Sequence, residues 1–549
     1  MLKTECTFVT STVVVEQYDV FEAGLPGRKD GNPFTDYTIR GRFTSEQETV
    51  HADGFYDGDG IYRIRFMPSH AGRYAWHVEG SFSDTPYDGS FLVKPAGPGN
   101  HGPVHVADRH HFSHADGTPY LPFGTTCYVW THQPEAVRQR TLQTLSKSPF
   151  NKIRFCVFPK HYIFNLTDPV SFPYEGTPCD RSGITEASFQ YNGELPGNHW
   201  DFTRFNTAHF QAFEEDIRSL MNLGIEADII VMHPYDCWGF CRMTAEQDDL
   251  YWRYVVARLS AFRNVWWSLA NEYDFMQEKK ESDWERFAEI LVSHDPYARL
   301  RSIHNGPRFY DHTRSWVTHC SVQSSEVART QEWLSQYDKP VIFDEMCYEG
   351  DIDQGWGNIT AEEMSHRCWE VALRGGYIGH GETYVFPAAS HCGARGPSVA
   401  DSQDPRAQEG DVKAETGPEA DAQRYLWWSH GNVLHGDSPA RIAFLQDVLA
   451  SVPGKRLRPM SLTWDIACAV PEDPTWQDRY KLLYLGNRRP SFRNFHFDDT
   501  HRYRVEIIDT WHMTIRDAGT FEGWFKVRLP SRQYIALRIT RLDDPTPSP

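Results

Sequence analysis

The sequence predicts an α/β protein in which a (β/α)8 TIM barrel is flanked by an N-terminal β-sandwich and a small C-terminal β-domain. Two observations favour this fold. Between residues 104 and 455, short apolar runs alternate with helical patterns, as in a parallel sheet with helical crossovers. On both sides of this region the helical patterns stop, and alternating strand patterns with turn-rich connections replace them. We therefore expect domains at 1–97, 104–455 and 456–549, in keeping with a length of 549 residues.

The first domain has the pattern of a small β-sandwich. YRIRF (62–66) and YAWHV (74–78) alternate apolar and polar residues, and Pro68 and Gly72 lie between them. The stretch 95–103, PAGPGNHGP, is a linker by composition.

The second region contains eight candidate strands with helical patterns between them. Phe210, Phe213, Ile217 and Leu220, for example, follow the 3.6-residue spacing of an amphipathic helix. The candidate strands are residues 120–124, 152–158, 226–232, 265–270, 299–304, 316–322, 340–345 and 376–382. Eight strands with intervening helices make the barrel the leading architecture.

Two long insertions, residues 160–205 and 386–422, follow candidate strands two and eight. Both leave from the carboxyl ends of strands, so both could frame an active-site mouth, and the second is lid-like or disordered by composition. A surface loop without a role is the alternative interpretation of the second insertion. Beyond residue 455 the sequence again has strand-like patterns, in runs at 481–486, 503–509, 524–529 and 534–540.

Composition excludes some partners. The chain has 55 basic and 74 acidic residues and a net charge of −19, which argues against nucleic acid or an anionic membrane surface and fits a neutral ligand. No apolar run is long enough to span a membrane. The 18 Trp fit both large cores and platforms for sugar rings, and exposed aromatic faces could make a homo-oligomer.

Cysteine usage and the N-terminus predict a cytoplasmic location. The 11 Cys are scattered without a C-x-x-C pair. The N-terminus lacks the charged region and unbroken apolar run of a secretion signal.

Two apolar runs end on carboxylates, which is unusual because an unpaired charge is costly to bury. Asn271-Glu272 closes the run at 265–270, and Glu345 closes the run at 340–345. The carboxyl ends of parallel barrel strands meet at one mouth, where two carboxylates about 5–5.5 Å apart can hydrolyse a glycosidic bond with retention of configuration. In this interpretation Glu272 is the acid/base, Glu345 is the nucleophile, and Asn271 binds the substituent at C2.

Each motif also has an ordinary structural interpretation that involves no catalysis. An N-E dipeptide is common, and D-E after a strand can be a helix N-cap or half of a salt bridge. The positions of these motifs, after strands four and seven of a set of eight, favour catalysis.

Other polar and aromatic residues near strand ends are candidate substrate-binding residues. Arg154 lies within strand two, and a cation pointing into a barrel must be paired, so we expect it to orient Glu345. The remaining candidates, each of which could instead be a satisfied core residue, are Trp130, His233, Asp236, His304, His319, Tyr348, Trp356 and Glu382.

Two rival functions remain open at this point. A metal-dependent hydrolase could gather His233, Asp236, His304 and His319, but the chain has no H-x-H after strand one and no H-E-x-x-H, so we expect neither a metal nor another cofactor. A non-catalytic carbohydrate-binding protein on a barrel scaffold is the other rival, and the intact carboxylate pair argues against it.

The barrel resembles clan A of the retaining glycoside hydrolases, which carry N-E after strand four and E after strand seven. The whole chain resembles a group with an N-terminal Ig-like domain, an apiosidase-like or cellulase-like barrel and a small C-terminal β-domain. The segments that carry this resemblance are residues 54–76, 116–130, 150–160, 268–274, 295–305 and 434–445. One departure is that residues 386–422 separate the strand-eight motif GHGETY from WWSHGNVLHG.

The resemblance implies an exo-type glycosidase that acts by double displacement on short oligosaccharides or plant glycosides. The candidate sugars that it implies are arabinofuranose, apiose, xylose, galactose and glucose.

Overall fold

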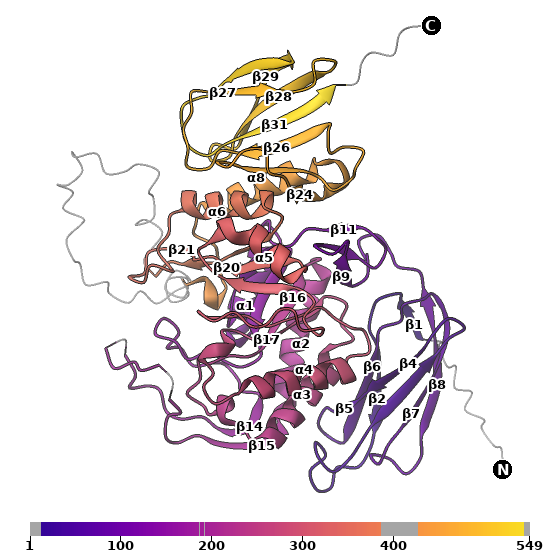
Figure 1. Cartoon of the computed structure of the whole chain (residues 1–549). Coiled ribbons are helices and arrows are strands. Elements are labelled where there is room, and N and C mark those ends of the chain that lie inside the picture. Colours follow the sequence, from indigo (N-terminus) through magenta and orange to yellow (C-terminus); the bar gives the residue numbers. More distant parts are fainter. Residues whose placement is uncertain (1–12, 186, 192, 386–426, 543–549) are drawn as a thin grey trace.

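The structure, a computed structural model of the chain, describes residues 13–185, 187–191, 193–385 and 427–542. Figure 1 shows a barrel in the centre, with one β-domain beside its helices α3 and α4 and another beyond helix α6 at the top. No helix within the described ranges has the length and apolar character needed to cross a membrane.

The N-terminal domain is a sandwich of two sheets. One has the strand order β1-β8-β7-β3-β4 and the other β2-β6-β5. Alternation along the strands buries one face of each sheet, and the stacked rings of Phe43 and Phe66 join the two. The strands are β1 (Val13–Glu16), β2 (Phe21–Pro26), β3 (Arg40–Thr44), β4 (Thr49–Asp53), β5 (Phe55–Tyr56), β6 (Ile61–Phe66), β7 (Gly72–Glu79) and β8 (Tyr87–Lys94).

A three-stranded sheet links the sandwich to the barrel. It consists of β9 (Val104–Ala107), β10 (His111–His114) and β11 (Pro119–Tyr120). Phe112 of β10 packs on the rings of Trp266, His319 and Tyr377, which lie near the start of barrel strands. This sheet therefore covers the end of the barrel at which the strands begin.

The barrel has eight parallel strands, as the sequence predicts. The strand order is β18-β17-β16-β13-β12-β22-β20-β19, and a bridge between His304 and Ser321 joins the two outer strands. The strands, in chain order, are β12 (Phe123–Thr126), β13 (Lys152–Cys156), β16 (Glu226–Met232), β17 (Val265–Ala270), β18 (Arg301–Ser302), β19 (Cys320–Gln323), β20 (Val341–Glu345) and β22 (Tyr377–His380). Every residue of β13, β16, β17 and β20 is buried, as expected for strands covered on both faces.

Helices surround the barrel. They are α1 (Glu135–Leu145), α2 (Thr207–Asn222), α3 (Ala245–Leu259), α4 (Glu281–His294), α5 (Thr330–Tyr337), α6 (Ala361–Leu373) and α8 (Ser438–Ala450). Single-turn 3-10 helices are η1 (Trp130–His132), η2 (Phe240–Arg242), η3 (Tyr273–Phe275), η4 (Val327–Arg329), η7 (Trp428–His430) and η8 (Pro453–Lys455). Residues 303–319, between β18 and β19, contain no helix.

The first long insertion and the loop after strand seven carry short strands of their own. A hairpin of β14 (Tyr174–Thr177) and β15 (His199–Phe205) lies in the first insertion. After strand seven, β21 (Glu349–Gly350) pairs with β23 (Glu382–Thr383). The expected eighth strand, 376–382, is therefore wrong at its end: β22 stops at His380, and Glu382 belongs to a separate two-stranded sheet. The second insertion, 386–422, lies outside the described residues.

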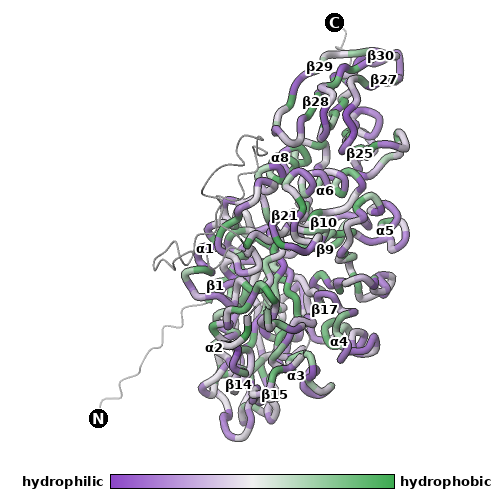
Figure 2. The backbone as a smooth tube through the Cα atoms, turned by 90° about the vertical axis from the view of Figure 1, so that its left-hand side faces the viewer, coloured by the Kyte–Doolittle hydropathy of each residue, from purple (hydrophilic) through white to green (hydrophobic). Residues whose placement is uncertain are grey.

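The C-terminal domain packs against α6 and α8. Its larger sheet has the order β24-β25-β26-β31-β28-β29, and β27 pairs with β30. Tyr484 of β26 stacks on Trp369 of α6, with ring centroids 5.5 Å apart. The strands are β24 (Leu457–Pro459), β25 (Ala467–Pro471), β26 (Tyr480–Tyr484), β27 (Phe492–His496), β28 (Arg502–Asp509), β29 (Thr514–Glu522), β30 (Trp524–Arg528) and β31 (Ile535–Leu542). Figure 2 shows hydrophobic segments running through the interior and hydrophilic segments at outer loops.

Candidate active site

A cavity of about 430 Å³ opens where the barrel strands end. Its volume falls in the range of about 300–1,000 Å³ that small-molecule sites usually have. Its walls come from segments that follow different barrel strands: Tyr128, Lys160, Tyr162, Tyr235, Glu272, Phe275, Gln323, Ser324, Ser325, Glu345, Cys347, Tyr348, Trp356 and Trp427. Both glutamates predicted from the sequence therefore face one cavity, Glu272 after β17 and Glu345 at the end of β20.

Glu272 occupies a strained backbone position. Its φ of 46° and ψ of 56° lie in the left-handed region, which non-glycine residues adopt at a cost of about 1–3 kcal/mol and mostly at functional sites. The side chain is buried and accepts hydrogen bonds from the hydroxyl of Tyr235, from Asn271 Nδ2 at 2.9 Å and from Gln323 Nε2 at 3.2 Å. Burial, together with the negative charge of Glu345, raises the pKa of Glu272 to about 7. Glu272 can therefore hold a proton near neutrality.

Glu345 has the opposite surroundings. Its carboxylate accepts hydrogen bonds from the hydroxyl of Tyr128 and from Arg154 Nη1 at 3.2 Å, and His304 Nε2 lies 3.4 Å away. Burial alone would raise its pKa, but His304, the charge of Arg154 and the Tyr128 hydroxyl outweigh burial and lower the pKa to about 2. Between about pH 2 and pH 7, Glu345 is therefore ionised while Glu272 is protonated.

Arg154 connects the two carboxylates. It is buried within β13, and its Nη1 donates to Asn271 Oδ1 at 2.8 Å as well as to Glu345. Asn271 in turn donates to Glu272. The structure thus places Arg154 against Glu345, which is the position expected for a cation inside the barrel. A pair of carboxylates with separated pKa values, held by one hydrogen-bonded chain, can supply an acid and an anion to the same reaction.

The structure brings some of the other predicted residues to this site. Tyr348 and Trp356 line the cavity, and Tyr348 shares a 3.0 Å contact with Tyr128 through their hydroxyls. His304 touches Glu345, and its Nδ1 lies 2.9 Å from Ser321 Oγ. Asn271 and Arg154 are absent from the cavity lining, but Asn271 donates to Glu272 and Arg154 donates to Glu345.

Four other predicted residues lie away from the cavity. Trp130 is fully buried, with its ring edge-on to Phe155. His233 Nε2 donates to the carbonyl of Phe158, and Asp236 accepts from the backbone N–H groups of Trp238 and Cys241, so these two residues stabilise loops. His319 packs on Trp266 and Phe112 at the opposite end of the barrel. His233, Asp236, His304 and His319 therefore do not converge on one centre.

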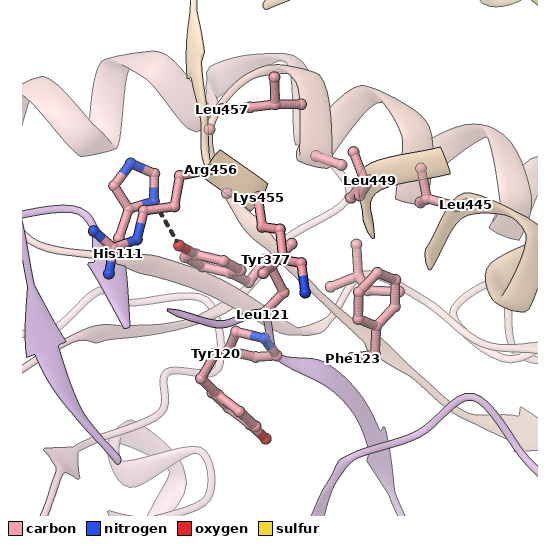
Figure 3. A pocket seen from close by; sticks show the side chains of 15 residues that line it. His111, Tyr120, Leu121, Phe123, Tyr377, Leu445, Leu449, Lys455, Arg456 and Leu457 are labelled. Carbon is pink, nitrogen blue, oxygen red and sulfur yellow. Dashed lines mark hydrogen bonds between the residues drawn. The ribbon is translucent and has the colours of Figure 1, made fainter. Parts of the chain in front are cut away.

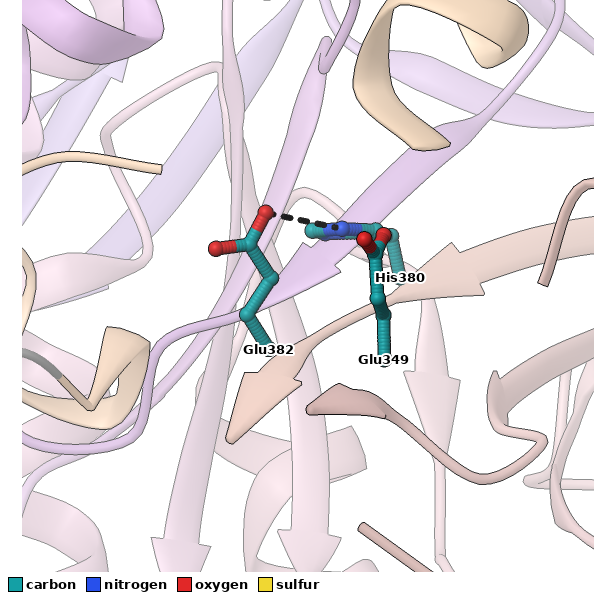
Figure 4. Close-up of side chains that lie close together, drawn as sticks. All are labelled: Glu349, His380 and Glu382. Carbon is teal, nitrogen blue, oxygen red and sulfur yellow. Dashed lines mark ion pairs between the residues drawn. The ribbon is translucent and has the colours of Figure 1, made fainter. Parts of the chain in front are cut away.

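Glu382 is also absent from the cavity lining, because it binds the start of helix α8. Its carboxylate accepts from the backbone N–H groups of His435 at 2.7 Å and Gly436 at 2.9 Å. Glu349 accepts from the next two, Asp437 at 2.8 Å and Ser438 at 3.1 Å. Figure 4 shows both carboxylates beside His380, whose Nε2 lies 3.7 Å from Glu382 Oε1. These three side chains are close enough to hold a metal ion, but backbone N–H groups at the start of α8 already donate to all four carboxyl oxygens of Glu349 and Glu382.

Sequence reasoning named Tyr348 and Trp356 of the cavity walls but not Tyr128, Lys160, Tyr162, Gln323 or Trp427. Tyr128 and Lys160 follow strands one and two, and Gln323 ends strand six. Their common signal is position, since each lies at or just after the carboxyl end of a barrel strand. Tyr162 and Trp427 lie further from the strands and carry no such signal.

A second, much smaller cavity of about 40 Å³ lies near the start of β12 and β22, between the barrel, α8 and η8 (Figure 3). Its lining is mostly apolar, with Tyr377 hydrogen-bonded to His111 at 3.0 Å. No carboxylate lines it among the described residues, so it lacks the groups that glycoside hydrolysis requires.

Comparison with known proteins places the chain in a family. Residues 106–390, just over half of the chain, match the apiosidase-like catalytic domain. Residues 14–81 and 464–540 match two domains of unknown function, DUF5060 and DUF5605. No curated protein matches the chain.

Two solved structures from Bacteroides vulgatus are similar. The structure of a candidate glycoside hydrolase is 33% identical in sequence, with a TM-score of 0.82, and the match covers 97% of the present chain and 100% of the other. A glycoside hydrolase of family 5 is 14% identical, with a TM-score of 0.54 and coverage of 81% and 94%, and shows similarity of fold alone. The family match and the first of these structures support glycoside hydrolase activity. The chain therefore belongs to the apiosidase-like family.

Proposed function

We propose that the protein is a retaining, exo-type glycoside hydrolase that acts by double displacement on short oligosaccharides or plant glycosides. One observation carries this proposal: Glu272 and Glu345, at the ends of the fourth and seventh barrel strands, line one cavity and have pKa values of about 7 and about 2. In this mechanism Glu345 attacks the anomeric carbon while Glu272 protonates the leaving oxygen. Glu272 then deprotonates the water that releases the sugar.

The surroundings of each glutamate suit its role. Arg154 and Tyr128 keep Glu345 anionic and hold its position, as a nucleophile requires. Asn271 accepts from Arg154 and donates to Glu272, and we expect it to bind the C2 substituent of the sugar. Tyr162, Tyr348, Trp356 and Trp427 give the cavity aromatic walls against which sugar faces can pack.

The test is a panel of 4-nitrophenyl α- and β-glycosides, both furanosides and pyranosides, of arabinose, apiose, xylose, galactose and glucose. Each is assayed with wild type and with Glu345→Gln. We expect turnover that the variant lacks, and NMR of the first-formed product should show the anomer of the substrate. Wild-type turnover in Glu345→Gln would contradict the assignment of the nucleophile, and an inverted product would contradict the double displacement.

Azide distinguishes the two carboxylates. In Glu272→Ala, azide can enter the space left by the acid/base and attack the glycosyl-enzyme in place of water, so we expect it to restore cleavage of activated aryl glycosides and to give a glycosyl azide of retained configuration. In Glu345→Ala we expect no product of retained configuration with azide. The opposite pattern would exchange the two roles.

A further inference from the structure

Lys160 is an unusual cation in this cavity. It follows β13, is only 4% exposed, and lines the cavity together with both glutamates. Its Nζ lies over three tyrosine rings, 3.6 Å from the centroid of Tyr128, 4.1 Å from that of Tyr235 and 4.9 Å from that of Tyr162. Since Tyr128 donates to Glu345 and Tyr235 to Glu272, this ammonium lies between the groups that hold the two carboxylates.

Lys160 has no hydrogen-bond acceptor or ion-pair partner among the described residues. The other buried Lys and Arg side chains of the described residues all donate to a carboxylate or a carbonyl. They are Arg65, Lys152, Arg154, Arg181, Arg258 and Arg299. Cation–π contacts stabilise an ammonium by about 0.5–2 kcal/mol each, but they do not satisfy its N–H donors. The three donors of Lys160 are thus left for whatever fills the cavity.

Neither glutamate forms an ion pair or a hydrogen bond with Lys160, since the partners of both carboxylates within the described part of the chain are other residues. Glu345 is matched by Arg154, and Glu272 must be protonated to act as an acid. A sugar that enters the cavity displaces the water that can solvate the ammonium, and the ligand must replace those interactions. A sugar hydroxyl group offers the ammonium a hydrogen-bond acceptor but no negative charge. A carboxylate offers both an acceptor and a negative charge.

We propose that the sugar bound next to the catalytic glutamates carries a carboxylate that pairs with Lys160, which makes the substrate a glycoside of a uronic acid. This inference rests on the proposed function. It replaces the neutral glucose and galactose among the candidate sugars with their C6-oxidised counterparts, glucuronic acid and galacturonic acid. The overall charge of −19 fits a neutral ligand, but that charge is spread over the whole molecule, whereas Lys160 is inside the cavity.

The experiment compares matched 4-nitrophenyl substrates, namely glucuronides with glucosides and galacturonides with galactosides, in both anomers. Wild type is assayed beside Lys160→Met, Lys160→Arg and the exposed control Lys147→Met. We expect wild type to favour one uronide over its neutral homologue in kcat/KM by about 100-fold or more, as for a buried charge pair. Lys160→Met should lower this ratio by about 100-fold, Lys160→Arg should keep part of it, and Lys147→Met should keep all of it.

A ratio that Lys160→Met leaves unchanged, or wild-type preference for the neutral sugar, overturns the inference. If neutral glycosides are then hydrolysed by wild type and not by Glu345→Gln, the glycosidase assignment stands and only the uronide assignment fails. Lys160 would in that case be a positioning residue for Tyr128 and Tyr235.

If no aryl glycoside is hydrolysed, calorimetric titration tests whether the cavity prefers a uronate and whether this preference depends on Lys160. Sodium D-glucuronate and D-galacturonate are titrated into Glu345→Gln, with D-glucose and D-galactose for comparison. The inference is supported, even if hydrolysis fails, if one uronate binds at least about tenfold tighter than the matching neutral sugar. This preference should disappear in the double variant Glu345→Gln/Lys160→Met. Equal affinity, or no binding of either uronate, overturns it.

Discussion

Glu272 and Glu345 are the same residue type, and their neighbours set their protonation states. Both are buried, which alone disfavours the charged form of each. Glu345 has Arg154 and His304 within 3.5 Å, at 3.2 and 3.4 Å, whereas Glu272 accepts only from neutral donors in the described part of the chain. The mechanism therefore needs pH values below the pKa of Glu272 and above that of Glu345.

The basic limb of the pH profile should report Glu272. Because the acid must be protonated, we expect kcat/KM to fall as pH rises through about 7. The hydroxyl of Tyr235 favours the ionised form, so Tyr235→Phe should raise the pKa of Glu272 and move this limb to higher pH. Profiles of kcat/KM for both proteins give the shift. A limb that moves to lower pH in the variant would contradict the assignment.

The acidic limb should respond to Arg154. Its guanidinium lowers the pKa of Glu345, so Arg154→Met should raise that pKa and move the acidic limb to higher pH. We also expect kcat to be lower by about 100-fold or more. Removing one partner of a buried ion pair can also cost about 3–5 kcal/mol of stability, so circular dichroism must show that the variant is folded at the assay temperature. A folded variant with an unmoved acidic limb would show that Arg154 does not control Glu345.

At the residue scale, sequence reasoning identified the charged side chains that lie within or at the end of an apolar strand, which is unusual for charged residues. A carboxylate closing an apolar strand is visible in the sequence, and so is a cation within one. Lys160 was not predicted, because it lies two residues beyond the predicted strand at 152–158, at the start of a long insertion, where lysine is normally solvated. Its burial depends on Tyr128, Tyr162 and Tyr235, which only the folded barrel brings together.

At the element scale, prediction was best for continuous apolar runs. The strands Glu226–Met232 and Val265–Ala270 have the predicted ends, because every residue in them is buried on one side or the other. The sixth strand was predicted at 316–322 but spans Cys320–Gln323. Trp316 and Val317 are apolar and buried in the preceding loop, and apolarity alone does not distinguish a buried loop from a strand.

The start of helix α8 should make stability depend on pH. Burial and the neighbouring Glu349 raise the pKa of Glu382 to about 8, above its ordinary value of 4.5. The folded state thus favours the protonated form, and this group's contribution to stability is largest below about pH 4.5 and is lost as pH rises through about 8. In Glu382→Gln we expect a smaller difference between the unfolding free energies at pH 5 and pH 8.5.

The same variant should be less stable than wild type at pH 5, by about 1–3 kcal/mol, because an amide NH2 replaces one acceptor of a backbone N–H. Denaturant unfolding measures both effects, and the exposed Glu289→Gln is the matched control. A pH dependence equal to that of wild type would show that Glu382 does not titrate differently in the folded state.

At the scale of the whole molecule, buried ion pairs join the sandwich to the barrel. Arg65 of β6 and Arg258 of α3 both contact Glu214 of α2, and Arg258 also contacts Asp57 at 2.8 Å. Burial would raise the pKa of Glu214, but the two guanidinium groups lower it to about 2. Buried ion pairs thus fix the N-terminal domain to two barrel helices, α2 and α3.

Glu214→Ala should weaken this interface. It leaves two buried cations short of a carboxylate, so we expect a loss of about 3–5 kcal/mol in the free energy of unfolding at pH 7. Because the folded pKa of Glu214 is depressed from 4.5, the wild-type advantage is present above about pH 4.5 and disappears as pH falls toward 2. Thermal unfolding at pH 7 and pH 3 measures it, and Glu332→Ala in the exposed pair with Arg329 is the control. Equal melting temperatures for Glu214→Ala and wild type at pH 7 would contradict this account.

The left-handed backbone at Glu272 implies a trade-off between stability and activity. Glycine adopts φ 46° without a steric cost and brings no carboxylate to bury, so the fold by itself gains nothing from glutamate at this position. Glu272→Gly should accordingly unfold at a higher temperature than Glu272→Ala, although both lack the proposed acid/base. The residue that the chemistry needs most is thus one that thermostabilising selection, applied without an activity screen, would tend to remove.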